Sequence, residues 1–105
     1  MAVIVATGTG IVLVNGFLVV EPSEFLKFLS GSDGERVVVL AVRDTGVVHK
    51  EKTYIYATVY GGFTLLTKTD TPLPLPSNTK TIKVEEIILP PAVWTKLNKI
   101  KPRKH

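Results

Sequence analysis

The chain consists of short runs of β-branched and other apolar residues separated by turns rich in glycine and proline, and this pattern restricts the fold most. In the first half, Asn15-Gly16 separates two such runs, residues 11–14 and 17–20. Asn-Gly tolerates positive φ at both positions, which is the geometry of a two-residue turn between antiparallel strands. We therefore predict a hairpin from Ile11 to Val20. Both of its faces would be apolar, which favours cover by a second copy of the chain.

A second hairpin is predicted around Gly61-Gly62, between strands over residues 53–60 and 64–69. A turn of two residues pairs Tyr60 with Phe63 and Tyr56 with Thr67. The alternation of side chains along a strand then separates two sets of residues. One face carries Tyr54, Tyr56 and Tyr60, and the other carries Ile55, Ala57 and Val59.

The remaining pattern predicts further strands over residues 2–6, 37–42 and 81–89, with an extended connector at Pro72, Pro74 and Pro76. Pro22 and Gly31 are typical of the start and the end of a helix. Pro90-Pro91 starts a second helix, whose apolar stripe is Val93, Trp94, Leu97 and Ile100. We expect this stripe to dock on the sheet.

These elements predict a mainly β fold of the β-rich α+β class. The expected architecture is a small antiparallel barrel or sandwich of about six or seven strands. A short helix lies near residues 22–30 and a C-terminal helix near residues 91–100. The length of 105 residues corresponds to one domain. We assign residues 1–100 to this domain and residues 101–105 to a basic C-terminal tail.

Charge is distributed unevenly along the chain. The net charge of +4 divides into −2 for residues 1–49 and +6 for residues 50–105. Such a basic half favours anionic partners, including nucleic acid, although a basic tail also aids solubility.

The tyrosine face of the second hairpin lies close in sequence to several lysines. Strand aromatics can stack on bases while neighbouring lysines hold phosphates, as in single-strand binders. The same tyrosines also fit the edge of a core, and this second interpretation is the preferred one. The candidate nucleic-acid-binding residues are Lys50, Lys52, Tyr54, Tyr56, Tyr60, Lys68, Lys99, Lys101, Arg103 and Lys104.

The sequence contains no recognisable set of catalytic residues. Asp44-Thr45-Gly46 resembles the active-site tripeptide of aspartic proteases, but Arg43 precedes it and Val47 follows it, unlike in that family. We therefore interpret this tripeptide as a turn. Cysteine is absent, and neither of the two histidines has a partner at the spacing of metal ligands. No catalytic residue, cofactor or metal site is predicted.

Taken together, the sequence predicts a non-enzymatic, small basic binding protein that associates with nucleic acid. The alternative is a homo-oligomeric structural or protein-interaction subunit that makes no contact with nucleic acid. The glycines at positions 8, 10 and 16 interrupt the uncharged first twenty residues, so no membrane span is expected there. The lack of cysteine and glutamine favours a cytoplasmic location and a thermophilic source.

Overall fold

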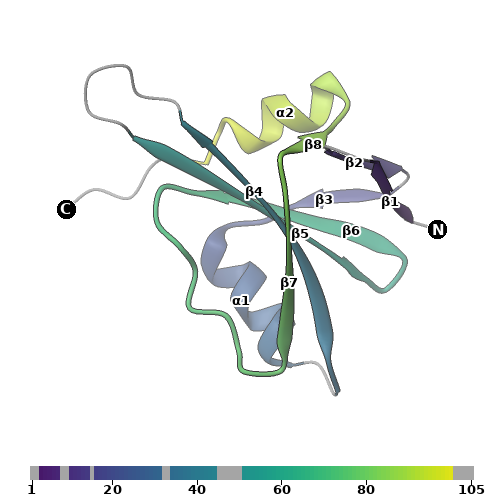
Figure 1. Ribbon diagram of the computed structural model, residues 1–105, viewed down its shortest axis with the longest axis vertical. Helices are drawn as coiled ribbons and strands as arrows, with labels where there is room; N and C mark the ends of the chain where they lie inside the picture. Colours follow the sequence, from purple (N-terminus) through teal and green to yellow (C-terminus); the bar gives the residue numbers. More distant parts are fainter. Residues whose placement is uncertain (1–2, 8–9, 15, 32–33, 45–50, 101–105) are drawn as a thin grey trace.

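The computed structural model describes residues 3–7, 10–14, 16–31, 34–44 and 51–100, with side chains described from residue 16 onward. These residues form eight strands and two helices (Figure 1). The strands are β1 (Val3–Thr7), β2 (Gly10–Val14), β3 (Phe17–Val19), β4 (Arg36–Asp44), β5 (Lys52–Tyr60), β6 (Phe63–Thr69), β7 (Thr79–Val84) and β8 (Glu86–Ile88). The helices are α1 (Pro22–Ser30) and α2 (Pro91–Leu97). The expected mainly β fold with two short helices is confirmed.

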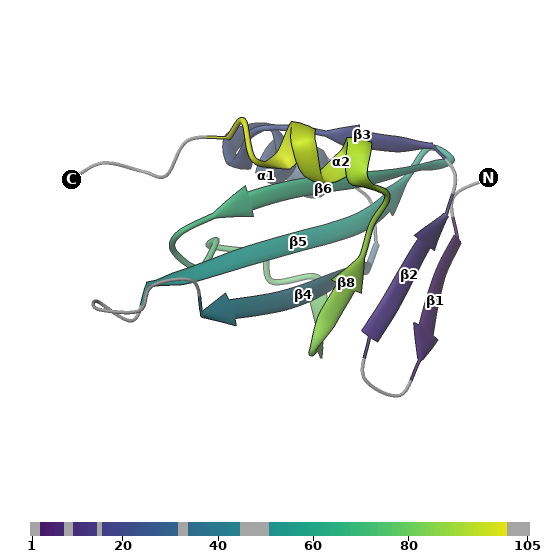
Figure 2. The same cartoon turned by 90° about the horizontal axis from the view of Figure 1, so that it is seen from above.

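The strands form two sheets, and the chain passes directly from one sheet to the other at two places. One sheet has the order β3-β6-β5-β4-β7 and the other has the order β1-β2-β8. The chain passes from β2 to β3 at Gly16, and from β7 to β8 at Glu85. Because β8 pairs with β2, β7 with β4, and β3 with β6, the pairings close into a barrel-like ring. The ring is visible in Figure 2, where β8 and β2 stand beside the larger sheet.

The sheets are mixed, whereas the sequence predicts an antiparallel arrangement. The antiparallel pairs are β1 with β2, β4 with β5, and β5 with β6. In each pair the two strands are consecutive in sequence, so a short connection can join them. The parallel pairs, β2 with β8, β3 with β6 and β4 with β7, join segments that are distant in sequence. Local turn patterns carry no information about such distant pairings, which explains the difference.

The hairpin predicted around Gly61-Gly62 is confirmed in detail. Tyr60 lies opposite Phe63 and Tyr56 lies opposite Thr67. Both glycines adopt positive φ, at 56° and 83°, as a tight turn of this kind requires.

The hairpin predicted from Ile11 to Val20 is wrong. β2 pairs with β1 and β8, and β3 pairs with β6 in the other sheet, so β2 and β3 are not neighbours. Gly16 has a φ of 43°, and its carbonyl accepts a 2.7 Å hydrogen bond from the Thr64 amide. A Cβ at Gly16 would lie only 3.0 Å from Cδ1 of Phe63. Glycine is therefore needed here to redirect the chain between sheets, and not to reverse it.

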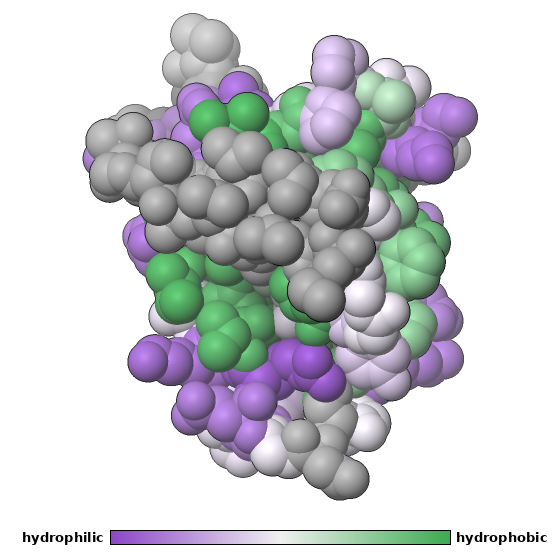
Figure 3. Space-filling model, turned by 90° about the vertical axis from the view of Figure 1, so that its right-hand side faces the viewer, coloured by the Kyte–Doolittle hydropathy of each residue, from purple (hydrophilic) through white to green (hydrophobic). Residues whose placement is uncertain are grey.

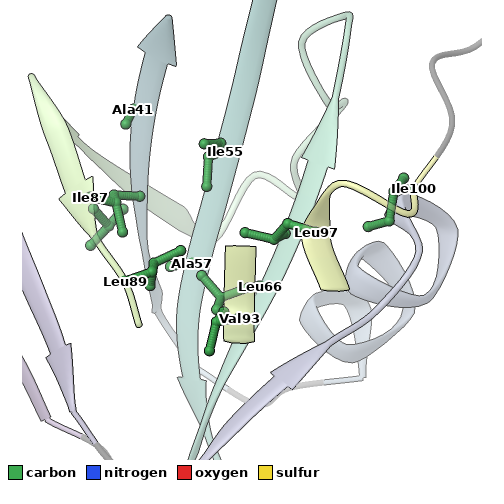
Figure 4. Close-up of a cluster of buried hydrophobic side chains, with 10 residues drawn as sticks. Ala41, Ile55, Ala57, Leu66, Ile87, Leu89, Val93, Leu97 and Ile100 are labelled. Atoms are coloured by element: carbon green, nitrogen blue, oxygen red, sulfur yellow. The ribbon is translucent and has the colours of Figure 1, made fainter. Parts of the chain in front are cut away.

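The five-stranded sheet is covered on both faces, with α1 and α2 on opposite sides (Figure 1). On the α1 face, Phe25 and Leu29 pack against Tyr56 and Leu65. On the α2 face, side chains from β4, β5, β6, β8 and α2 converge (Figure 4). The buried members of this second cluster are Val39, Ala41, Ile55, Ala57, Leu66, Ile87, Leu89, Val93, Leu97 and Ile100.

Both helices begin where the sequence predicts them. α1 spans the predicted residues 22–30, and the Gly31 amide closes it with a 3.0 Å bond to the Lys27 carbonyl. α2 is shorter than predicted and ends at Leu97, after which a turn carries the chain to Ile100. α2 also contacts β3, and it therefore lies near an edge of the five-stranded sheet.

Candidate nucleic-acid interface

Tyr56 lies in the core and presents no ring face to a ligand. Its side chain is 2% exposed, and its ring centroid lies 6.1 Å from that of Phe25. The Leu73 amide donates a 3.0 Å hydrogen bond to the phenolic oxygen. Burial raises the pKa of the Tyr56 phenol, and this effect exceeds the lowering caused by the Leu73 amide. Tyr56 therefore has the role of a core residue, the interpretation that the sequence already favoured.

The other two tyrosines of the stripe are half-buried on the same face. Tyr54 and Tyr60 pack against the cluster beneath α1. The Tyr60 ring meets Phe28 edge-on with centroids 5.0 Å apart, and the Arg36 guanidinium lies 5.2 Å from the Tyr60 centroid. The contacts of these rings are thus made within the chain, and the tyrosines do not form an open stacking platform.

The predicted lysines lie partly on the opposite face from the tyrosines. Lys52 is exposed at the first residue of β5, opposite Asp44. Lys68 lies on the α2 side of β6, where its Nζ donates to Oδ1 of Asn98 at 3.3 Å. Lys99 is exposed in the turn that follows α2, next to Asn98. The predicted residues Lys50, Lys101, Arg103 and Lys104 lie outside the described residues.

Trp94 lies at the rim of the α2 cluster and not at its centre. Val93, Leu97 and Ile100 are at most 7% exposed, as the predicted stripe requires, whereas Trp94 is only partly buried. The guanidinium of Arg43, on β4, lies 5.4 Å from the Trp94 ring centroid. Positions four apart on a helix lie on one side, so Trp94 and Asn98 bring Arg43 and Lys68 to the same flank of α2.

Two hollows lie beside these cations. One, of about 480 Å³, is lined by Lys68, Glu21 and the start of α1. The other, of about 230 Å³, is lined by Lys96, Lys99 and Ile100 together with Val19, Val20 and Glu21. Glu21 is the acidic residue common to both hollows, so an anion in the first would lie near Lys68 and Glu21, and an anion in the second near Lys96, Lys99 and Glu21.

The cations at this end of α2 form no salt bridge with another residue that the structure describes. Among the residues that the structure describes, the one ion pair joins Lys27 to Glu24 at 3.5 Å on the surface of α1. We call the set Arg43, Lys68, Trp94, Asn98 and Lys99 the α2-end surface. An aromatic ring with cations beside it can bind a phosphate and stack on a base.

Sequence reasoning found two members of this surface, Lys68 and Lys99, and missed the other three. Alternation along β4 places Arg43 on the same face as Val39 and Ala41. This pattern could have indicated from the sequence that Arg43 shares a face with those two residues. No sequence signal placed α2 over that end of β4, so the contact between Arg43 and Trp94 depends on the tertiary structure.

The part of the chain that the structure describes contains no group of residues arranged to hold a metal ion. None of its helices has the length and apolar character needed to cross a membrane. Comparisons of the chain with family models, with curated proteins and with solved structures found no match. Fold and surface together define a small β-rich domain in which Arg43 contacts the single tryptophan, while Lys68 and Lys99 lie at the end of the same helix.

Proposed function

We propose that this protein is a non-enzymatic, small basic binding protein that associates with nucleic acid through the α2-end surface. The observation that carries the proposal is the contact of Arg43 with a partly exposed indole on the helix whose end carries Asn98, which Lys68 contacts, and Lys99. Lysine and arginine supply the phosphate contacts, and the indole supplies a stacking face.

The composition of the C-terminal tail supports this choice of surface. Lys101, Arg103 and Lys104 follow Ile100 directly in sequence, and Ile100 closes the turn after α2. The tail therefore adds three positive charges that are tethered next to the α2-end surface. Each phosphate neutralised by these cations releases condensed counterions, so binding should weaken as the salt concentration rises.

Fluorescence anisotropy with a labelled 20-nucleotide single strand and its duplex, across a salt series, tests the proposal. The double variant Lys68→Ala/Lys99→Ala should weaken binding and reduce the slope of log K against log salt. The expected reduction is about 0.7 per lost phosphate contact for a single strand and about 0.9 for a duplex.

The matched control is Lys80→Ala/Lys83→Ala on β7. It removes the same charge from exposed positions, beside Val37 and Leu40 and away from Arg43 on the neighbouring strand. An equal effect of both double variants would show that net charge alone drives binding and would refute the proposed surface. Absence of binding by the unaltered protein at low salt would refute the function itself.

A second candidate function is a homo-oligomeric or protein-interaction subunit. It is favoured by the exposure of several large apolar side chains, at 41–51%, namely Leu18, Val37, Phe63, Ile82 and Ile88. Light scattering at micromolar concentration tests it, since a monomer would exclude the homo-oligomer. The interface first predicted for it, a hairpin from Ile11 to Val20, does not exist as a unit because β2 and β3 belong to different sheets.

We also propose a cytoplasmic location and a thermophilic source, both from composition. The chain has no cysteine, and its only methionine is Met1. Sulfur-containing residues, which oxidise easily, are thus nearly absent. This is consistent with both a cytoplasmic location and a thermophilic source.

A further inference from the structure

β7 is the last strand of the five-stranded sheet, and no described strand pairs with its outer edge. The Arg36 amide donates to the Asn78 carbonyl at 3.0 Å where the ladder between β4 and β7 begins. Because bonding alternates along a parallel ladder, the backbone groups of Lys80 and Ile82 point towards β4. Those of Thr81 and Lys83 point outward. β7 thus offers two amides and two carbonyls to another strand.

The side chains around this edge combine apolar and basic character. Residues 80–83 are all exposed, and Ile82 on β7 and Val37 on β4 are each 41% exposed. Ile82 lies opposite Val39, whose side chain faces the α2 cluster, so Val37 and Ile82 share that face. Figure 3 views the molecule from the right-hand side of Figure 1, and it shows apolar side chains next to hydrophilic ones on that side.

Lysine supplies the charge of this edge. Lys80 shares a face with Ile82, and Lys83 lies on the opposite face. The acidic residues Glu85 and Glu86 come only after β7 has ended. A strand laid along β7 would therefore meet positive charge on both of its faces.

These observations discriminate between possible occupants. A second copy of β7, paired antiparallel and centred on Ile82, would bring the two Lys83 side chains onto one face as diagonal neighbours. Like charges at such cross-strand positions are destabilising, whereas opposite charges are stabilising. Edge lysines also discourage unwanted pairing between copies. A strand with acidic side chains on the Lys83 face avoids this repulsion and uses Lys83 as a partner.

We propose that β7 binds an extended peptide segment in which acidic residues alternate with apolar ones, as an added strand of the sheet. Its backbone bonds to Thr81 and Lys83, its apolar side chains lie on the face of Ile82 and Val37, and its carboxylates lie on the opposite face, where they pair with Lys83. Strand addition to an exposed sheet edge is an established mode of peptide recognition. The site is separate from the α2-end surface and does not depend on nucleic-acid binding.

The proposal is tested by measuring amide hydrogen exchange by NMR with and without a peptide. The peptide is a decapeptide of alternating glutamate and valine whose two termini are blocked. In the free protein, the Thr81 and Lys83 amides should exchange rapidly, whereas Lys80 and Ile82 are protected by β4. Saturating peptide should slow exchange at Thr81 and Lys83 at least tenfold, and the corresponding lysine–valine peptide should not. The proposal would be overturned if the peptide slowed exchange at other amides and not at Thr81 and Lys83, or if both peptides bound equally well.

Two variants at one position isolate the backbone contact. Proline is tolerated on an edge strand where its missing amide would face solvent, so Thr81→Pro should preserve the ladder with β4 and abolish peptide binding. Thr81→Ala removes the side chain, keeps the amide and should bind normally. Unchanged binding by a folded Thr81→Pro protein would refute strand addition.

A charge reversal keeps the proposal testable if Thr81→Pro does not fold. Lys80→Glu/Lys83→Glu should exchange the preference, so that the lysine–valine peptide binds and the glutamate–valine peptide does not. Protection of Thr81 and Lys83 that is already present in the free protein and is lost on dilution would identify a second copy as the occupant. That result would overturn the peptide proposal.

Discussion

The two faces of the five-stranded sheet are closed in different ways. On the α1 face, aromatic rings pack against one another, and the Tyr56 hydroxyl is satisfied by the Leu73 amide. On the α2 face, an aliphatic cluster is bordered by the Arg43–Trp94 pair and by Lys68. The tyrosines, which the sequence suggested for binding, are thus packed, while the tryptophan expected in the core lies at a charged rim. Residue type alone does not say which aromatic residue is available to a ligand.

The largest expected effect is on the closed α1 face. Phe25 is fully buried, so Phe25→Ala should lower the free energy of unfolding by about 3–5 kcal/mol, the cost of truncating a buried large aromatic. Urea denaturation followed by circular dichroism measures this cost. A loss below 1 kcal/mol would mean that α1 does not seal this face.

Trp94→Ala should cost less, about 1–2 kcal/mol, because part of the indole is already in water. The native emission of Trp94, which is the single tryptophan, should lie between the wavelengths of a buried and of a solvated indole. The distinction between the two faces would be removed if Trp94→Ala lowered the free energy of unfolding as much as Phe25→Ala does and the native emission were that of a fully buried indole.

Tyr56→Phe should lower the free energy of unfolding by about 0.5–1.5 kcal/mol at pH 7, because the Leu73 amide loses its acceptor. The pKa of Tyr56 is raised above its ordinary value of 10.0, so the folded state holds the phenol proton more tightly than the unfolded state does. The stability from neutral Tyr56 is therefore complete below pH 10 and is lost as the pH rises through the raised pKa.

Urea denaturation between pH 8 and pH 11.5 tests this dependence. Tyr56→Phe should lose less stability across the range than the unaltered protein does. Tyr60→Phe, which keeps the Tyr56 hydroxyl, serves as the control and should retain the full loss. Identical pH profiles for both variants would argue against a buried Tyr56 phenol.

The smallest expected effect is at the rim of the α2 face. Arg43→Ala should cost about 0.5–1 kcal/mol, since it removes an exposed cation–π contact with Trp94. It should also shift Trp94 emission, whereas Arg43→Lys should retain part of the contact. Unchanged emission in Arg43→Ala would show that the two side chains do not meet in solution.

The features that the sequence predicts well are those determined over a few residues. Pro22 and Gly31 bound α1, and the two glycines at 61–62 set the register of β5 against β6. The alternation along β5 also separates Tyr56 from Ile55 onto different faces. In each case the backbone preference and the side-chain period act locally, so neighbouring residues contain the necessary information.

The Asn15-Gly16 segment shows where local information is insufficient. A two-residue turn and a link between two sheets both suit a glycine with positive φ, and the sequence does not distinguish between them. The choice depends on β6 and β8, which lie far along the chain and pair with β3 and β2 respectively. The strand predicted over residues 81–89 likewise divides at Glu85, because its two halves pair with different strands.

The sequence by itself determined the β-rich class, the helix boundaries near Pro22 and Pro91, and an excess of positive charge in the second half. Only the tertiary structure decided that Tyr56 is enclosed, that Arg43 meets Trp94, and that the outer edge of β7 has no described partner. The physical reason is that propensity and alternation act between near neighbours. Burial and exposure depend instead on which distant segments cover a side chain, and that is settled by packing across the whole chain.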